Sequence, residues 1–325
     1  MTTFYQQQAA NRRKSLLLAV VVVALLAALG MAIGFAMTGE PVGALAVTIG
    51  AVVLGTVLSI GSYFSGDKLV LAASGAKPID ETQAPQLINI VRELSLAAGL
   101  PMPKVYVIDD SAPNAFATGR DPEHASIAVT TGLLQKLDRE ELQGVIGHEL
   151  AHVRNFDIRF TLMVGVLVGS IALLADMYLR WSFWFGGGRR GVKGGGRDAA
   201  GFAAIMAVLA IVLAIVAPII ARLVQMAVSR QREYLADASA VELTRNPYGL
   251  ERALAVIASD REVLEVANRA TQHLYFTNPI KKFEKRASGL FSTHPAIVDR
   301  VNRLRDLTGR PALGQEEIAV LAGLD

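Results

Sequence analysis

The sequence predicts a mainly α-helical, polytopic membrane protein with a small β-sheet, and three observations lead to this fold class. The 325 residues are 52% hydrophobic and only 19% charged, which is more apolar than an ordinary soluble domain. Four apolar segments are each long enough to cross a hydrocarbon core about 30 Å thick. They are Leu16–Met37, Val42–Phe64, Phe160–Tyr178 and Phe202–Leu223. The remaining stretches mix short strand patterns with amphipathic helix patterns.

The first two apolar segments form a predicted transmembrane helical hairpin over residues 15–64, with a tight turn at Glu40. Residues 1–14 precede it and end in Arg12, Arg13 and Lys14. Positive charge next to a span favours the cytoplasmic side, so both ends of the hairpin are expected there. A cleaved signal peptide is the alternative for the first segment, but its apolar stretch is longer than the 7–15-residue apolar region of a typical signal peptide.

The third and fourth segments form a second apolar hairpin, residues 158–226, whose path has two readings. Five basic residues lie between the segments, and they would be external if both segments span, against the charge rule. The hairpin either spans with an unusual external loop or packs partly in the membrane and partly on the rest of the protein. Both readings return the chain to the side that it left.

The stretches 65–157 and 227–325 have the mixed composition of a globular domain built in two parts. Ala84–Ala98 is predicted to be an amphipathic helix, and Lys104–Ile108 and Ser126–Thr130 are predicted strands. The Gly-rich basic loop 186–197 cannot bury a core and is expected to be flexible. A phosphate-binding loop is its alternative, but the Lys-Ser/Thr ending of that motif is missing.

Composition also excludes some classes of function. The chain has no cysteine, which rules out disulfides, thiolate metal sites and a cysteine nucleophile. A net charge of +3 fits basic flanks that face an anionic leaflet of a lipid bilayer, and it requires no nucleic acid partner.

The most specific motif is His148-Glu149-Leu150-Ala151-His152. It follows an acidic turn at residues 138–141 and lies among apolar residues at helical spacing. On a helix, H-E-x-x-H places two imidazoles on one face beside a carboxylate, as in zinc peptidases. A solvated helix face is the alternative, and the apolar neighbours weigh against it.

A catalytic zinc needs a third protein ligand, and Glu233 is the candidate. Glu233 and Asp237 are i and i+4 on a predicted helix, so Glu233 would ligate zinc and Asp237 would accept the spare N–H of a ligand histidine. The alternative is a surface face on which Arg230 and Arg232 pair with these carboxylates.

The combined pattern resembles the HtpX heat-shock membrane metalloproteases, relatives of the CAAX prenyl protease. It consists of H-E-x-x-H, two apolar segments, Ser-Arg-x-Arg-Glu-Tyr-x-Ala-Asp at 229–237 and Ser-Thr-His-Pro at 292–295, and it extends to about Leu304. The resemblance implies a gluzincin-like metallopeptidase domain with one Zn²⁺ per chain, held by His148, His152 and Glu233. Glu149 would be the general base and Asp237 an orienting partner.

The resemblance also implies a role for His294, which would stabilise the oxyanion with Arg300 as support; helix capping or packing is the alternative. Asn114, Ala115, Phe116 and Ala117 match the family's edge strand for substrate, and a core strand that buries Phe116 is the alternative.

The implied function is a stress-response endopeptidase of the cell (inner) membrane with its catalytic domain facing the cytoplasm. Its substrates would be unfolded polypeptides and damaged membrane proteins, in proteolytic quality control. A CAAX-type prenyl protease and a non-catalytic membrane scaffold are the alternatives. The four segments would struggle to enclose the large chamber of the former, and the complete ligand set weighs against the latter.

Overall fold

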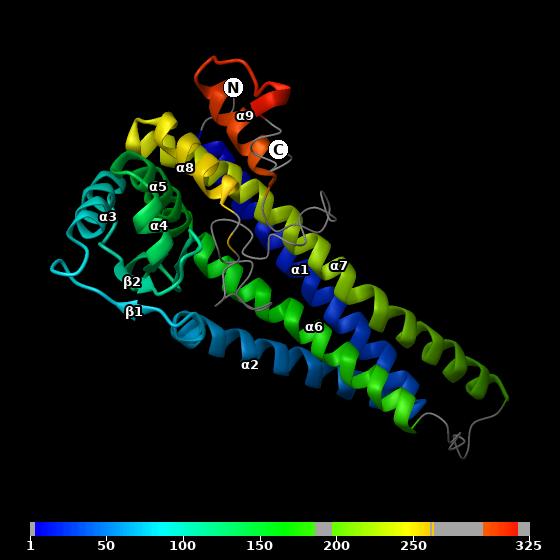
Figure 1. Cartoon of the computed structure of the whole chain (residues 1–325). Helices are drawn as coiled ribbons and strands as arrows, with labels where there is room; N and C mark the ends of the chain where they lie inside the picture. Colours follow the sequence, from blue (N-terminus) through cyan, green and yellow to red (C-terminus); the bar gives the residue numbers. More distant parts are fainter. Residues whose placement is uncertain (1–3, 186–196, 261, 263–294, 318–325) are drawn as a thin grey trace. The chain divides into compact units, whose positions relative to one another are not determined.

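The computed structural model describes residues 4–185, 197–260, 262 and 295–317 (Figure 1). The chain divides into two compact units. The globular unit comprises Met1–Asn11, Tyr63–Thr161 and Met226–Asp325, and the apolar unit comprises Arg12–Ser62 and Leu162–Gln225. The Gly-rich segment 186–196 and His294 lie outside the described residues, so the predictions made for them stay predictions.

Helices dominate the described residues, as the fold class predicted. They are α1 (Phe4–Thr38), α2 (Pro41–Ala73), α3 (Pro85–Ala98), α4 (Thr131–Lys136), α5 (Arg139–Arg154), α6 (Asp157–Phe185), α7 (Arg197–Thr244), α8 (Pro247–Ser259) and α9 (Ile297–Leu307). The strands are β1 (Lys77–Pro78), β2 (Lys104–Ile108), β3 (Ala115–Thr118) and β4 (Ser126–Thr130), with a short 3₁₀ turn at Pro122–His124. The expected helix and the two expected strands are confirmed to within one residue, whereas β1, α4, α8 and α9 were not foreseen.

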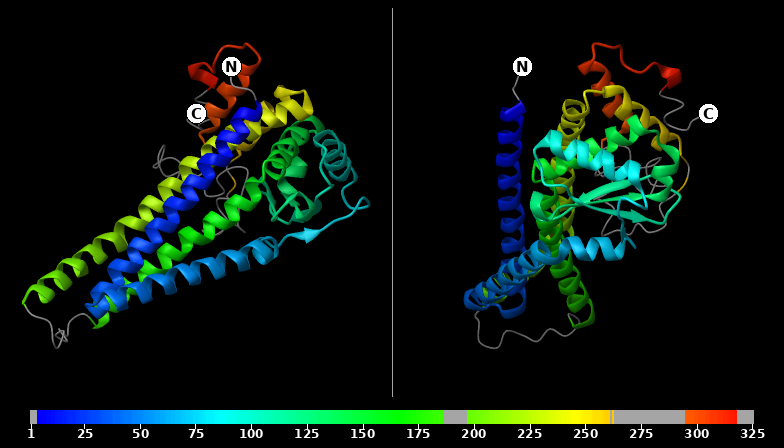
Figure 2. Two further views of the ribbon diagram at one scale, coloured as in Figure 1. Left: turned by 180° about the vertical axis from the view of Figure 1, so that it is seen from behind. Right: turned by 90° about the vertical axis from the view of Figure 1, so that its left-hand side faces the viewer.

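The four strands form one mixed sheet in the order β1-β2-β4-β3. The right-hand view of Figure 2 shows strand arrows of this sheet beside helices of the globular unit. β2 and β4 are parallel, with Lys104 opposite Ser126, and β3 is antiparallel to β4, with Phe116 opposite Ala128. Gly119 lies in the connection after β3 with φ +141°, where a Cβ would approach the His124 carbonyl oxygen to 2.5 Å. This order leaves β3 at one edge of the sheet.

Alternate residues of the strands enter two different hydrophobic clusters, as the period of two in a strand requires. The larger cluster packs one face of the sheet against α3, α5, α8 and α9, and includes Ile127 and Val129. The smaller cluster holds Phe116 and Ala128 against Leu71 at the end of α2. Phe116 is completely buried, as the core-strand alternative requires, and its strand nonetheless lies at an edge of the sheet.

α5 begins with a complete capping box. The Asp138 side chain accepts a hydrogen bond from the Glu141 N–H, and the Glu141 carboxylate accepts one from the Asp138 N–H. Such a cap satisfies N–H groups that the first helical turn leaves unpaired and contributes about 1 kcal/mol. The helix is buried along most of its length, including Val145, Leu150 and Val153, which fixes the motif side chains firmly.

The apolar unit consists of long segments of α1, α2, α6 and α7 (Figure 1). Within them Val20–Thr38 and Pro41–Leu58 are long and apolar enough to cross a membrane, with mean hydropathies of 2.6 and 2.1, and Ile205–Ala221 is a shorter apolar stretch. α1 and α2 approach closely at Gly34, where a Cβ would lie 2.5 Å from the Ala44 Cα. Much of the outer surface of α2 is apolar, including Val42 and Leu45, as expected of a helix that contacts lipid.

Candidate metal centre

His148 and His152 lie one turn apart on α5 with their rings nearly perpendicular. The ring centroids are 4.7 Å apart and the planes meet at 87°. Their Nε2 atoms point toward each other at 3.1 Å, and His148 is completely buried. Two imidazole nitrogens that face each other at this distance can supply two ligands to one metal ion.

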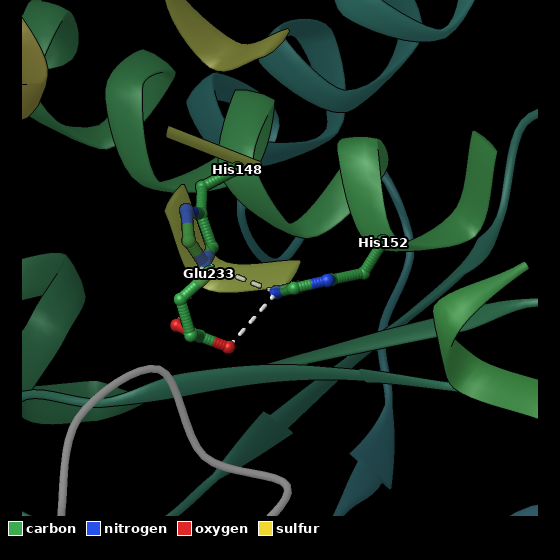
Figure 3. A group of neighbouring side chains, drawn as sticks. All are labelled: His148, His152 and Glu233. Atoms are coloured by element: carbon green, nitrogen blue, oxygen red, sulfur yellow. Dashed lines mark hydrogen bonds and ion pairs between the residues drawn. The ribbon is translucent and has the colours of Figure 1, made fainter. Parts of the chain in front are cut away.

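Glu233 completes the set from α7, far along the chain (Figure 3). Its carboxylate oxygens lie 3.4 Å from the His148 Nε2 and 3.4 Å from the His152 Nε2. Donors about 2.1 Å from a tetrahedral ion are roughly 3.4 Å apart, so the observed spacings fit zinc. The described residues therefore contain a His-His-Glu site suited to one zinc ion.

Small residues allow α7 to come this close to α5. A Cβ on Gly147 would lie 3.2 Å from the Thr244 side chain and 3.5 Å from Ala240, so the two helices pack almost backbone to backbone. Because Glu233 and Asp237 precede Ala240 on α7, this approach brings their carboxylates to His148.

The outer ring nitrogen of His148 is held by a buried acid and a buried arginine. The Asp237 Oδ1 lies 2.8 Å from His148 Nδ1. Arg300 lies on α9 and donates two hydrogen bonds to the Asp237 carboxylate, from Nε at 2.9 Å and from Nη2 at 2.6 Å. Although burial acts to raise it, the Arg300 guanidinium and His148 lower the pKa of Asp237 below its ordinary value. Arg300 thus contacts Asp237, and also approaches Glu233 at 3.9 Å.

A second acid, which the sequence reasoning missed, holds His152. Asp157, the first residue of α6, places Oδ2 3.1 Å from His152 Nδ1. Its other oxygen pairs with Arg232. The alternative in which Arg232 pairs with Glu233 or Asp237 on a surface face is therefore wrong, because Glu233 and Asp237 are both at least 95% buried. An acidic residue five positions after the motif was the signal available in the sequence.

Glu149 lies in the same buried region, at the edge of the sheet. Burial raises the pKa of its carboxyl, while His148 and His152 oppose that shift. The nearby backbone N–H of Ala117 in β3, a strand that α5 contacts, also acts to lower the pKa of Glu149. The structure thus brings the motif acid to the strand formed by residues 115–118.

Comparison with known proteins gives one consistent family. Residues 81–308 match Peptidase family M48. A protein described as "Protease HtpX homolog" from Streptococcus uberis is 42% identical over 283 residues, which cover 87% of this chain and 93% of the relative. Another of that description, from Caldanaerobacter subterraneus subsp. tengcongensis, is 46% identical over 248 residues, 76% of this chain and 80% of the relative.

A more distant likeness is found among solved structures. The crystal structure of S. mikatae Ste24p aligns with a TM-score of 0.45 at 20% identity, covering 92% of this chain and 66% of that one. The sequence relatives and the His-His-Glu site carry the assignment: the chain belongs to peptidase family M48 as an HtpX-type membrane zinc metalloendopeptidase.

Proposed function

We propose that this peptidase cuts unfolded polypeptides and damaged membrane proteins at the cytoplasmic face of the cell membrane, with Glu149 as general base and β3 as the substrate strand. The observation that supports the catalytic part is the proximity of the Glu149 carboxylate to the backbone N–H of Ala117 in β3, a strand at the edge of the sheet.

The register of β3 supports its role in binding an extended peptide. The Thr130 N–H donates to the Asn114 carbonyl oxygen at 3.0 Å, so Asn114 faces β4. Because successive residues of an antiparallel strand alternate in direction, the N–H and C=O groups of Ala115 and Ala117 face away from β4. The Ala115 N–H is taken by the Asn114 side chain at 3.0 Å. The carbonyl oxygens of Ala115 and Ala117 share that outer side, where substrate N–H groups would donate to them.

The chemistry follows from the roles of the surrounding groups. Zinc held by His148, His152 and Glu233 would supply Lewis acidity, which lowers the pKa of water and polarises a carbonyl. Glu149 would accept the proton of the attacking water and deliver it to the leaving amine, since it directly follows the zinc ligand His148 on α5. Asp237 and Arg300 would keep His148 in place.

Recognition through main-chain hydrogen bonds suits substrates with little sequence in common. The relatives named "Protease HtpX homolog" and the two long apolar helices support a role at the membrane. An active site tethered at the bilayer meets the cytoplasmic loops of other membrane proteins at a high effective concentration. Damaged membrane proteins whose loops have lost their fold would be the preferred substrates.

The first test is cleavage of casein by the full chain in detergent, comparing wild type with Glu149→Gln. We expect zinc-dependent cleavage that falls by about 10²-fold or more in this variant. Glu140→Gln, an exposed position on the same helix, is the matched control and should retain wild-type activity. Equal activity in the two variants would show that Glu149 is not the base.

The second test addresses the substrate class in reconstituted vesicles. We expect a destabilised membrane protein to be cut faster than its stable form. Equal rates would contradict the quality-control role while leaving the peptidase assignment intact. Cleavage confined to a prenylated C-terminal peptide would instead favour the prenyl protease alternative.

A further inference from the structure

Each metal-binding histidine is backed by its own carboxylate and arginine, and of these four groups the sequence predicted only Asp237 as a partner of a ligand histidine. His148 is backed by Asp237 and Arg300, and His152 by Asp157 and Arg232. We propose that Asp157 and Arg232 are positioning residues that fix the His152 ring with Nε2 directed at zinc. This inference rests on the metal-binding role of His152.

The backbone between the two helices is shaped to deliver Asp157 to His152. α5 ends at Arg154 with Asn155 as its cap, and α6 begins only two residues later at Asp157. Phe156, which lies between them, has φ +57°. A non-glycine residue in this left-handed region costs about 1 kcal/mol or more, and such conformations concentrate at functional sites. The turn brings the Asp157 carboxylate to the His152 ring, five residues earlier in the chain.

Arg232 pairs with the oxygen of the Asp157 carboxylate that His152 does not contact. It lies on α7 directly before the metal ligand Glu233, and it is 7% exposed while Asp157 is 5% exposed. Its guanidinium also lies 3.9 Å from the centroid of the Phe160 ring, one turn into α6. A planar guanidinium can pair with a carboxylate and stack on a ring at once, which a lysine cannot do. Asp157 is therefore held in one orientation.

The Asp157 carboxylate would determine which nitrogen of the His152 ring carries the proton. A neutral imidazole carries its proton on one nitrogen, and an acceptor at Nδ1 places the proton there. Nε2 then presents its lone pair to the metal. Partners of this kind typically change metal affinity or activity by 10–100-fold when mutated. The alternative is that the buried pair only joins α6 to α7 and contributes to stability.

Zinc affinity separates these two roles. It is measured on the full chain in detergent by competition with a chromophoric chelator, for wild type, Asp157→Asn and Arg232→Lys. We expect about a 10–100-fold weaker affinity for Asp157→Asn and a smaller loss for Arg232→Lys, which retains the charge but not the stacked plane. The absorption spectrum of the Co²⁺-substituted protein should change in both variants, because the ligand geometry changes.

The matched control is Glu251→Gln. Glu251 is also a largely buried carboxylate between two arginines, Arg305 and Arg310, but it contacts no metal ligand. We expect Glu251→Gln to lower the stability of the protein without changing its zinc affinity.

Zinc affinity within about two-fold of wild type in Asp157→Asn would overturn the proposal. If Asp157→Asn does not fold, an unchanged affinity and Co²⁺ spectrum in Arg232→Lys would overturn it equally. If the wild-type protein binds no zinc, the metal site itself is wrong, and with it the proposed role of Asp157 and Arg232.

Discussion

At the scale of single residues, Arg300 has the largest fully buried side chain in the part of the chain that the structure describes. It is 1% exposed, and its guanidinium neutralises Asp237 while lying 3.9 Å from Glu233. A buried ion pair is weak evidence of net stabilisation, yet removing one partner leaves an uncompensated buried charge. Stability of the metal-free protein should therefore depend strongly on this one residue.

We expect Arg300→Met to destabilise the metal-free protein by about 3–5 kcal/mol, because Asp237 would be left buried without its partner. The double variant Arg300→Met, Asp237→Leu should cost less than the sum of the two single variants. Denaturant unfolding of the four proteins measures this coupling. Additive effects would show that the two side chains do not stabilise each other.

The sequence predicted the residues whose spacing is local and missed those that are brought together by folding. H-E-x-x-H and the pair Glu233 and Asp237 are each i, i+4 patterns that a helix alone explains. Asp157 required the left-handed turn at Phe156, which nothing in the local composition indicates. Arg300 lies 63 residues from Asp237, so their pairing depends on the packing of α9, a helix that was not foreseen.

At the scale of elements, the packing of α5 against α8 depends on the absence of a side chain at Gly144. A Cβ there would lie 2.6 Å from the Leu250 nitrogen and 2.7 Å from its Cα, which are backbone atoms that cannot rotate away. We expect Gly144→Ala to destabilise the protein by about 1–3 kcal/mol despite the better helix propensity of alanine.

Gly169 on α6 provides the contrast, because a Cβ there would meet nothing within 4 Å. Gly169→Ala should leave stability unchanged or raise it by up to about 1 kcal/mol. Thermal unfolding of both variants in one detergent makes the comparison. Equal destabilisation by both would mean that steric contact at Gly144 is not the cause.

The segment after α9 is anchored by Glu317. Hydrogen bonds from Arg305 and from the Gly314 N–H lower the pKa of Glu317 to about 2. A depressed folded-state pKa contributes stability above the unfolded value near 4.3, and that contribution is lost as the pH falls toward 2. We therefore expect the Leu313 amide, which donates to Asn302 at 2.8 Å, to lose protection against hydrogen exchange between pH 5 and pH 2.5.

Glu317→Gln should show low protection of this amide throughout that range, and Glu316→Gln, the neighbouring control, should follow wild type. The Leu150 amide in α5 reports whether the whole protein unfolds. A pH-independent protection factor at Leu313 in the wild type would contradict the anchoring role of the carboxylate.

At the scale of the whole chain, the site is assembled from two stretches that a long apolar insertion separates. His148 and His152 precede the apolar parts of α6 and α7, and Glu233 follows them. The sequence predicted this assembly because each side carries a recognisable half of the ligand set. The sequence left open whether residues 158–226 cross the membrane. Their hydropathy favours two spans, which would place the basic loop outside, whereas the positive-inside rule favours that loop on the cytoplasmic side.

The absence of cysteine makes the topology directly measurable. If the N-terminus is cytoplasmic, Glu40 between α1 and α2 is external and the exposed Thr82 in the globular unit is cytoplasmic. We expect a membrane-impermeant maleimide to label Glu40→Cys in intact cells and to label Thr82→Cys only after permeabilisation. The reverse pattern would place the catalytic domain outside.

Arg190→Cys then distinguishes the two readings of the second hairpin. Labelling in intact cells would show that α6 and α7 both cross the membrane, and that a basic loop is tolerated outside because the first hairpin has already set the orientation. Labelling only after permeabilisation would show a hairpin that does not cross. The cysteine-free wild type controls for background, and casein cleavage by each purified variant shows that the labelled protein is the active one.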